Sequence, residues 1–163
     1  MKKVVLTITL VLCALTVYAV EKEDLFDDYK IYSKYVEKTI YKTKKEVFSE
    51  INKLKKLMID NEKENVTLKL TDIHNKIIQL DNLIKEYSNK MKTFNMKESL
   101  TYPVYELSFY EKVIKETADY YYKQGSITKK EIEAVEEKYK DEKSAVNKKA
   151  ETLRHDFLKA VFE

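Results

Sequence analysis

The stretch VTLKLTDIHNKIIQLDNLIKEYSNKMKTF, residues Val66–Phe94, decides the fold. Its apolar residues follow one another at alternating spacings of four and three without a miss, which is the heptad period of a coiled-coil helix. One core position of this seam is occupied by Leu70, Ile77, Ile84 and Met91. No asparagine or lysine interrupts the seam, so nothing in it dictates the register or the number of partner helices. We expect a helix over residues 62–94.

The preceding segment, from about residue 23 to residue 60, is also amphipathic but has a different period. Four of its apolar residues recur every eleven residues, namely Leu25, Val36, Val47 and Met58. An eleven-residue repeat averages about 3.67 residues per turn, whereas a heptad averages about 3.5. The two stripes therefore cannot mesh along their whole length. We expect either a local bend in one helix or a further partner for the second.

The joint between these segments is IDNEKEN, residues 59–65, which contains neither glycine nor proline. Asn61 followed by Glu64 has the spacing of a helix-capping box, which favours a turn. The apolar phase also continues through Met58 and Val66, as it would in an unbroken helix. Both segments are roughly 50 Å long at about 1.5 Å per residue, and equal lengths suit a hairpin. We favour an antiparallel hairpin, with one continuous helix as the alternative.

The chain has one glycine and one proline, far fewer than the many turns of β and α/β folds require. The sequence therefore predicts an all-α fold, an elongated antiparallel bundle or set of coiled-coil hairpins with three to four long helices. Two further helices are expected over residues 103–124 and 129–162. Pro103 suits the first turn of the former, where its missing N–H has no intrahelical partner to lose.

The single glycine marks a corner between these last two helices, in the stretch GSITKKEI at residues 125–132. Gly125 can adopt the left-handed conformation that ends a helix. Thr128 and Glu131 then form the capping box of the next helix, and the isoleucines on either side of the cap form a hydrophobic staple. We expect a helix–turn–helix corner here, since no glycine cluster or P-loop lysine suggests a phosphate site.

The first residues have the layout of a secretory signal peptide. MKK is a basic start, VVLTITLVLCALTV at residues 4–17 is an apolar core, and VYA ends at Ala19, where we expect cleavage. The alternatives are an uncleaved membrane anchor, for which the apolar run is at the short limit, and lipidation of Cys13, which Leu12 disfavours. The expected product is one helical domain, residues 20–163, exported to the periplasm, the cell surface or the medium, with no stable membrane span.

Cleavage would remove the only cysteine of the chain and two of its lysines. The mature chain would then have no disulfide, no thiolate nucleophile and no cysteine metal ligand. The full chain has 31 basic and 28 acidic residues, so losing two lysines leaves the charges almost evenly balanced. This balance argues against a nucleic-acid-binding protein, which would show a basic surplus.

No pattern for catalysis, a cofactor or a metal is visible. His74 and His155 lack a histidine or carboxylate at the spacing of a metal motif such as HExxH, and we expect both at the edge of the seam or at the surface. We therefore expect neither an enzyme nor a small-molecule substrate. Three consecutive tyrosines span about 200° of a helix, so at least one must be exposed or lie at an interface. The candidate protein-interaction surface is therefore Tyr120, Tyr121 and Tyr122. The alternative is a compositional excess of tyrosine, with half-buried rings whose hydroxyls reach water.

The layout resembles the small secreted coiled-coil adhesins of the FadA type. The resemblance consists of the MKK…VYA signal, the amphipathic segment Glu23–Asp60 and the unbroken seam Val66–Phe94. It implies helical hairpins that assemble into filaments, and hence a secreted or periplasmic protein that binds proteins or itself. The chain is also similar in outline to Skp-type holding chaperones, which clasp clients between long helices. A periplasmic holding chaperone for envelope proteins is therefore the alternative function.

Overall fold

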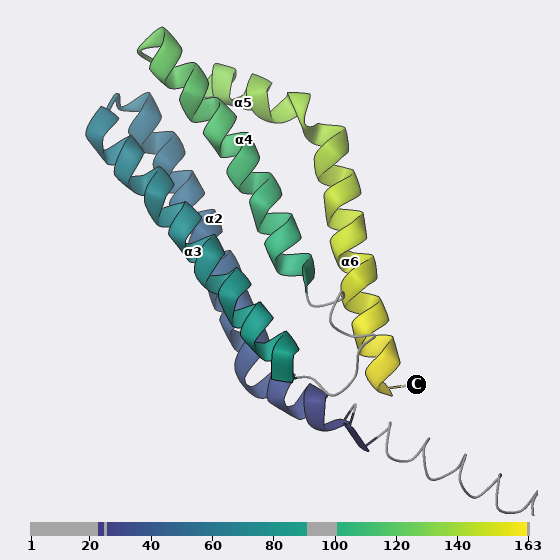
Figure 1. Cartoon of the computed structure of the whole chain (residues 1–163). Helices are drawn as coiled ribbons and strands as arrows, with labels where there is room; N and C mark the ends of the chain where they lie inside the picture. Colours follow the sequence, from purple (N-terminus) through teal and green to yellow (C-terminus); the bar gives the residue numbers. More distant parts are fainter. Residues whose placement is uncertain (1–22, 25, 91–100, 163) are drawn as a thin grey trace, which may run out of the picture.

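A computed structural model describes residues 23–24, 26–90 and 101–162, and every regular element within them is a helix. The elements are η1 (Tyr32–Val36), α2 (Glu37–Ile59), α3 (Lys63–Lys90), α4 (Tyr102–Gln124), α5 (Lys129–Lys138) and α6 (Lys140–Phe162). The long helices run alternately up and down beside one another (Figure 1). The predicted all-α bundle is confirmed. Three predicted features lie outside the described residues: the signal peptide with its cleavage site at Ala19, Leu25, and the end of the seam from Met91 to Phe94.

Helices α2 and α3 form an antiparallel hairpin, so the favoured interpretation of residues 60–65 is confirmed. Asn61 turns the chain with a φ of 61°, in the left-handed region. Two ion pairs join the helices, Lys69 with Glu50 at 2.6 Å and Lys76 with Glu46 at 3.1 Å. The residue numbers of the partners rise along α3 and fall along α2. This order requires the two helices to be antiparallel.

The predicted seam is the inner face of α3. Ile77 and Ile84 are 4% and 3% exposed, and Leu70 is half-buried. The other seam position is occupied by Val66, Ile73, Leu80 and Tyr87, which are buried as well. These side chains share one hydrophobic core with α2, α4 and the start of α5. The described part of the seam therefore packs against other helices of the same chain.

The different periods of the two stripes are accommodated in both of the ways expected from the sequence. Residues 26–31 are helical and lead directly into η1, a short π-helical turn. There the N–H of Glu37 donates to the carbonyl of Tyr32, five residues earlier, which shifts the helical phase locally. Tyr32 and Val36 are both buried by this turn. Helix α3, in turn, packs against α4 as well as α2.

The corner between α4 and α5 is formed as predicted. Gly125 ends α4 with a φ of 79°, and its N–H donates to the carbonyl of Tyr121 at 2.8 Å. The N–H of Glu131 donates to Thr128 Oγ1 at 3.3 Å, while the N–H of Thr128 donates to Glu131 Oε2 at 2.7 Å. The isoleucines on either side of the cap are both buried in the main core. All parts of the predicted corner are therefore present.

The single helix predicted over residues 129–162 is wrong, because the structure has two helices that separate at Tyr139. The Tyr139 hydroxyl donates to Glu116 of α4, which holds the break in place. An unbroken helix would carry Glu142 on its core-facing line. After the break Glu142 faces outward instead and pairs with Lys112 of α4 at 2.8 Å, so no charge is buried.

Helix α4 lies between the α2–α3 hairpin and α6 (Figure 1). Among the described side chains of α6, Val146 and Ala150 are buried, and Val146 shares a small second core with Phe109 and Val113 of α4. The α6 helix is thus held to α4 by a narrow apolar contact. None of the described helices combines the length and the hydrophobicity needed to cross a bilayer.

Candidate interaction surfaces

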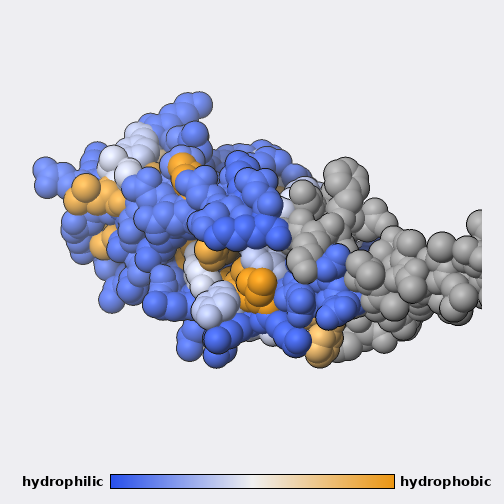
Figure 2. Space-filling view, turned by 60° about the horizontal axis from the view of Figure 1, so that its bottom comes forward, coloured by the Kyte–Doolittle hydropathy of each residue, from blue (hydrophilic) through white to orange (hydrophobic). Residues whose placement is uncertain are grey.

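The view in Figure 2 shows a largely hydrophilic face with small hydrophobic patches. One open hollow of about 290 Å³ lies between α3 and α4, and it is lined by Leu70, Thr71, His74, Glu111 and Lys115. His74 Nδ1 lies 2.5 Å from Glu111 Oε1, in an exposed position. The surface positions predicted for His74 and His155 are confirmed. The described residues contain no group of three or more His, Cys, Asp or Glu side chains able to hold a metal ion.

A second hollow, of about 240 Å³, lies between α2, α4 and α6. Lys44 and Glu106 form an ion pair of 2.5 Å on its wall. The hydroxyls of Tyr102 and Tyr32 lie 3.4 Å apart below it. Burial raises the pKa of both phenols, which therefore stay protonated near neutral pH. The arrangement offers paired charges and neutral phenols.

The three consecutive tyrosines point to three different elements. Tyr121 is completely buried, Tyr120 is half-buried, and Tyr122 is 42% exposed. Their hydroxyls meet, in chain order, Glu131 of α5 at 3.1 Å, Asn61 of the hairpin turn at 2.8 Å and Thr67 of α3 at 2.5 Å. The triplet joins the two hairpins at one end of the bundle. The exposed surface that it offers is mainly the ring of Tyr122, beside α3.

The outer face of α3 is uncharged over about four turns. Of residues 67–82, eight are exposed: Thr67, Leu68, Thr71, His74, Asn75, Ile78, Gln79 and Asn82. None is Lys, Arg, Asp or Glu, in a chain of which 36% is charged. Leu68 is 69% exposed and Ile78 is 43% exposed. We name these eight residues the uncharged face.

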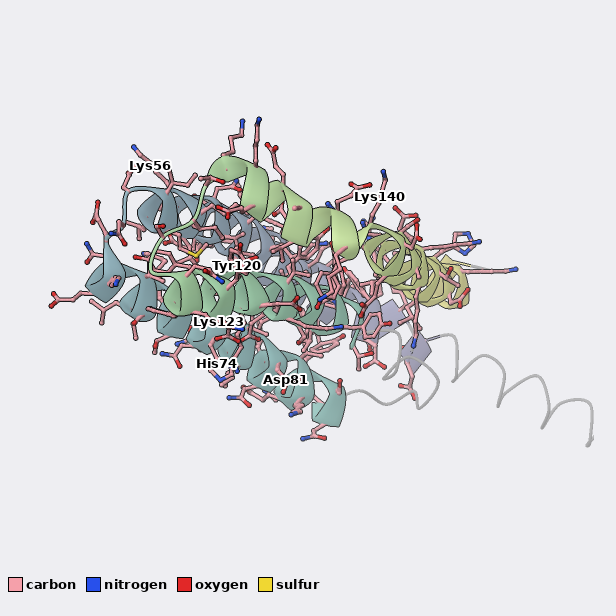
Figure 3. The ribbon with its side chains drawn as sticks, turned by 90° about the horizontal axis from the view of Figure 1, so that it is seen from above. Lys56, His74, Asp81, Tyr120, Lys123 and Lys140 are labelled. Atoms are coloured by element: carbon pink, nitrogen blue, oxygen red, sulfur yellow. The ribbon has the colours of Figure 1, made fainter. Side chains whose placement is uncertain are left out.

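The outer face of α2 and of the turn before it has the opposite character. Between residues 30 and 59 the exposed side chains include seven lysines, Lys30, Lys34, Lys38, Lys42, Lys45, Lys53 and Lys56, and no acidic residue. We name these seven residues the lysine face. They lie opposite the buried stripe of α2, and Lys56 points away from the bundle in Figure 3.

The acidic residues of the same stretch pair both within α2 and with other helices. Within α2, Glu46 lies 3.9 Å from Lys42 and Glu50 lies 2.8 Å from Lys53. The same two carboxylates also pair with lysines of α3, and Glu37 lies 3.8 Å from Arg154 of α6. Three lysines of the lysine face therefore have a carboxylate partner on their own segment, namely Lys30, Lys42 and Lys53. The exposed residues of the stretch still carry an excess of positive charge.

Sequence reasoning missed both faces. The charge balance of the whole chain is nearly even, and a net charge does not show on which side of a helix the charged side chains lie. A signal was nevertheless present, because Lys34, Lys38, Lys42 and Lys45 follow one another at spacings of four, four and three. That spacing places them on one side of a helix.

No protein-family model, curated protein or solved structure matches this chain. The function is therefore inferred from the chemistry of the surfaces.

Proposed function

We propose that this is an exported, non-enzymatic helical interaction protein that associates with a second copy of itself through the uncharged face of α3. The observation that carries the proposal is the run of eight exposed, uncharged residues on a helix of a highly charged chain. Centres of protein interfaces are depleted of charge, because a charge buried without a partner loses its hydration. None of the eight residues of the uncharged face is Lys, Arg, Asp or Glu, so contact through them desolvates little ionised surface.

A second α3 helix in antiparallel orientation fits this face. Leu68 and Ile78 are ten residues apart, roughly 15 Å along the axis. An antiparallel pair related by a two-fold axis places Leu68 opposite Ile78 of the second copy, and Thr71 opposite Asn75. Each copy then covers the exposed apolar side chains of the other. Thr67 then lies opposite Gln79, whereas His74 and Asn82 come opposite the acidic residues Asp72 and Glu64.

The charges at the two ends of the face complement one another in this orientation. Glu64 is exposed before the face and Lys85 is exposed after it. In the same register, Glu64 of one copy comes within about three residues of Lys85 of the other, roughly 4.5 Å along the axis. Lys63 and Glu86 meet in the same way. A parallel pair would instead place like charges together.

One pair of helices of this length buries less area than the ~1,600 Å² typical of a stable protein complex. We therefore expect a reversible dimer, which the ring of Tyr122 strengthens from the edge of the face. A two-fold pairing also closes on itself. Filaments of the kind that the resemblance to FadA-type adhesins implies would need a further, different surface.

Sedimentation equilibrium of the full chain over a range of concentrations tests the proposal. The wild-type protein is expected to approach twice the 19.4 kDa chain mass. The exchanges Leu68→Glu and Ile78→Lys should each weaken the dimer at least about tenfold, since each places an unpaired charge against an apolar side chain. Ile59→Glu is the matched control, because Ile59 is 44% exposed but lies on α2.

The double variant Leu68→Glu/Ile78→Lys tests the orientation. In the antiparallel register each glutamate faces a lysine of the second copy, so the dimer should recover relative to both single variants. No recovery would refute this register. A wild-type chain that stays monomeric at every concentration would refute self-association altogether.

A further inference from the structure

We propose that the lysine face of α2 binds the surface of a membrane that contains anionic lipids. This inference is independent of self-association, because it concerns the other outer face of the hairpin. Lys56 lies on the opposite side of the bundle from His74 and Asp81 of α3 (Figure 3). A dimer formed through α3 would leave the lysine face accessible.

The face has the length and charge distribution of a surface-binding helix. Lys30 and Lys56 are 26 residues apart, so the face is roughly 40 Å long at about 1.5 Å per residue. Asp27, Glu46 and Glu50 pair with Lys30, Lys42 and Lys53 and offset part of this charge, and an excess of positive charge remains along the face. A row of lysines on one side of a helix lowers its free energy near an anionic leaflet, and the attraction falls off within a Debye length.

Exposed apolar side chains lie among the lysines and favour a lipid partner. Ile31 is 45% exposed and Tyr35 is 58% exposed near one end of the face, and Ile59 is 44% exposed at the other. The Lys34 ammonium lies 5.1 Å from the centre of the Tyr35 ring, so a charge and an aromatic ring are presented together. Tyrosine rings settle at the headgroup level of bilayers, and apolar side chains between cationic ones insert beneath it.

The choice of cation also favours lipid over nucleic acid. The only arginine of the chain is Arg154 on α6, whose guanidinium donates to the hydroxyl of Tyr41 at 2.6 Å. The lysine face therefore lacks a guanidinium group, which can donate two hydrogen bonds at once to a guanine edge or to a phosphate. Lysine ammonium groups act as point charges, which suffices for a fluid layer of headgroups.

Co-sedimentation of the full chain with vesicles tests this inference. One set contains phosphatidylcholine with about one third phosphatidylglycerol, and the other contains phosphatidylcholine alone. The readout is the difference in binding between the two sets. The apolar segment of residues 4–17 carries no charge and is present in every variant, so it contributes equally throughout.

Two quadruple variants with the same change in net charge separate the face from general electrostatics. The first removes four neighbouring charges of the lysine face, and the second removes four exposed lysines from other helices. They are Lys34→Gln/Lys38→Gln/Lys42→Gln/Lys45→Gln and Lys115→Gln/Lys123→Gln/Lys130→Gln/Lys148→Gln. Each lysine near an anionic surface accounts for roughly a fivefold change in partitioning, so the first variant should lose more than about a hundredfold.

The second variant should bind the anionic vesicles nearly as the wild type does. Binding of the wild type should also fall steeply towards roughly 1 M salt, where the Debye length is about 3 Å. Equal binding to both vesicle sets, or equal losses in both quadruple variants, would overturn the inference. It would also be overturned if a DNA duplex bound more tightly than the anionic vesicles and lost that binding in the first variant.

Discussion

Asn61 and Tyr121 form a contact that ties the two hairpins together at one end of the bundle. The Tyr121 hydroxyl donates to Asn61 Oδ1 at 2.8 Å, across 60 positions of the chain. Asn61 also has a φ of 61°, the only positive φ of a described residue other than glycine. One residue therefore turns the α2–α3 hairpin and accepts a hydrogen bond from α4. These two roles can be separated by mutation.

The expected magnitudes follow from the surroundings of the two side chains. Tyr121→Phe removes the bond and leaves the exposed Asn61 amide to water, so it should cost about 1 kcal/mol. Asn61→Gly keeps the left-handed turn but leaves the hydroxyl of a buried tyrosine without its partner, which should cost about 1–2 kcal/mol. Asn61→Ala should cost about 1 kcal/mol more than Asn61→Gly, because a Cβ disfavours the left-handed conformation.

Urea unfolding followed by far-ultraviolet circular dichroism measures these differences, provided the slope against urea is unchanged. The double variant Asn61→Gly/Tyr121→Phe completes a cycle. If the bond exists, the double variant should be about 1 kcal/mol more stable than the sum of the single effects implies. Strictly additive effects would refute the bond. Equal stabilities for Asn61→Ala and Asn61→Gly would refute the conformational argument.

Two further predictions concern the corner between α4 and α5. Gly125→Ala should destabilise the protein by about 1 kcal/mol although nothing lies within 4 Å of the added Cβ, because φ is 79°; an unchanged thermal midpoint would contradict this. Hydrogen bonds from the Thr128 side chain and N–H lower the pKa of Glu131 below its ordinary value of 4.5. A lowered pKa adds stability above the unfolded-state pKa, and this contribution is lost as the pH falls below it. The destabilisation caused by Thr128→Ala, measured by urea unfolding at neutral and acidic pH, should therefore shrink below pH 4.5, and a constant or growing effect would contradict the capping geometry.

The two outer faces together suggest how the hairpin divides its roles. We propose pairing with another helix for the uncharged face of α3 and binding to anionic surfaces for the lysine face of α2. Both faces belong to helices whose inner sides are fully occupied by the core. The hairpin therefore supplies two surfaces of different chemistry without changing its packing.

The sequence by itself determined the helical nature of each segment, the inner stripe of α3 and the corner at Gly125. All three depend on residues three or four positions apart, or on a cap and its first turn. They can therefore be predicted from the local spacing of residues in the sequence. The near absence of glycine and proline excluded other fold classes for the same local reason. The described part of the seam and the capping box accordingly lie where they were expected.

Only the tertiary structure decided the break at Tyr139 and the chemistry of the outer faces. The break depends on a contact with Glu116 of α4, 23 positions earlier, which no local pattern contains. Beside the lysine face, Glu37, Glu46 and Glu50 each share their charge with a cation of another helix, so the exposed residues of the stretch keep an excess of lysine. Composition counts those carboxylates fully against the lysines of α2, whereas packing divides them between helices. The side of a helix on which a charged side chain lies, and the partner it pairs with, depend on residues that are distant in the sequence. The lysine face could therefore be recognised only in the folded bundle.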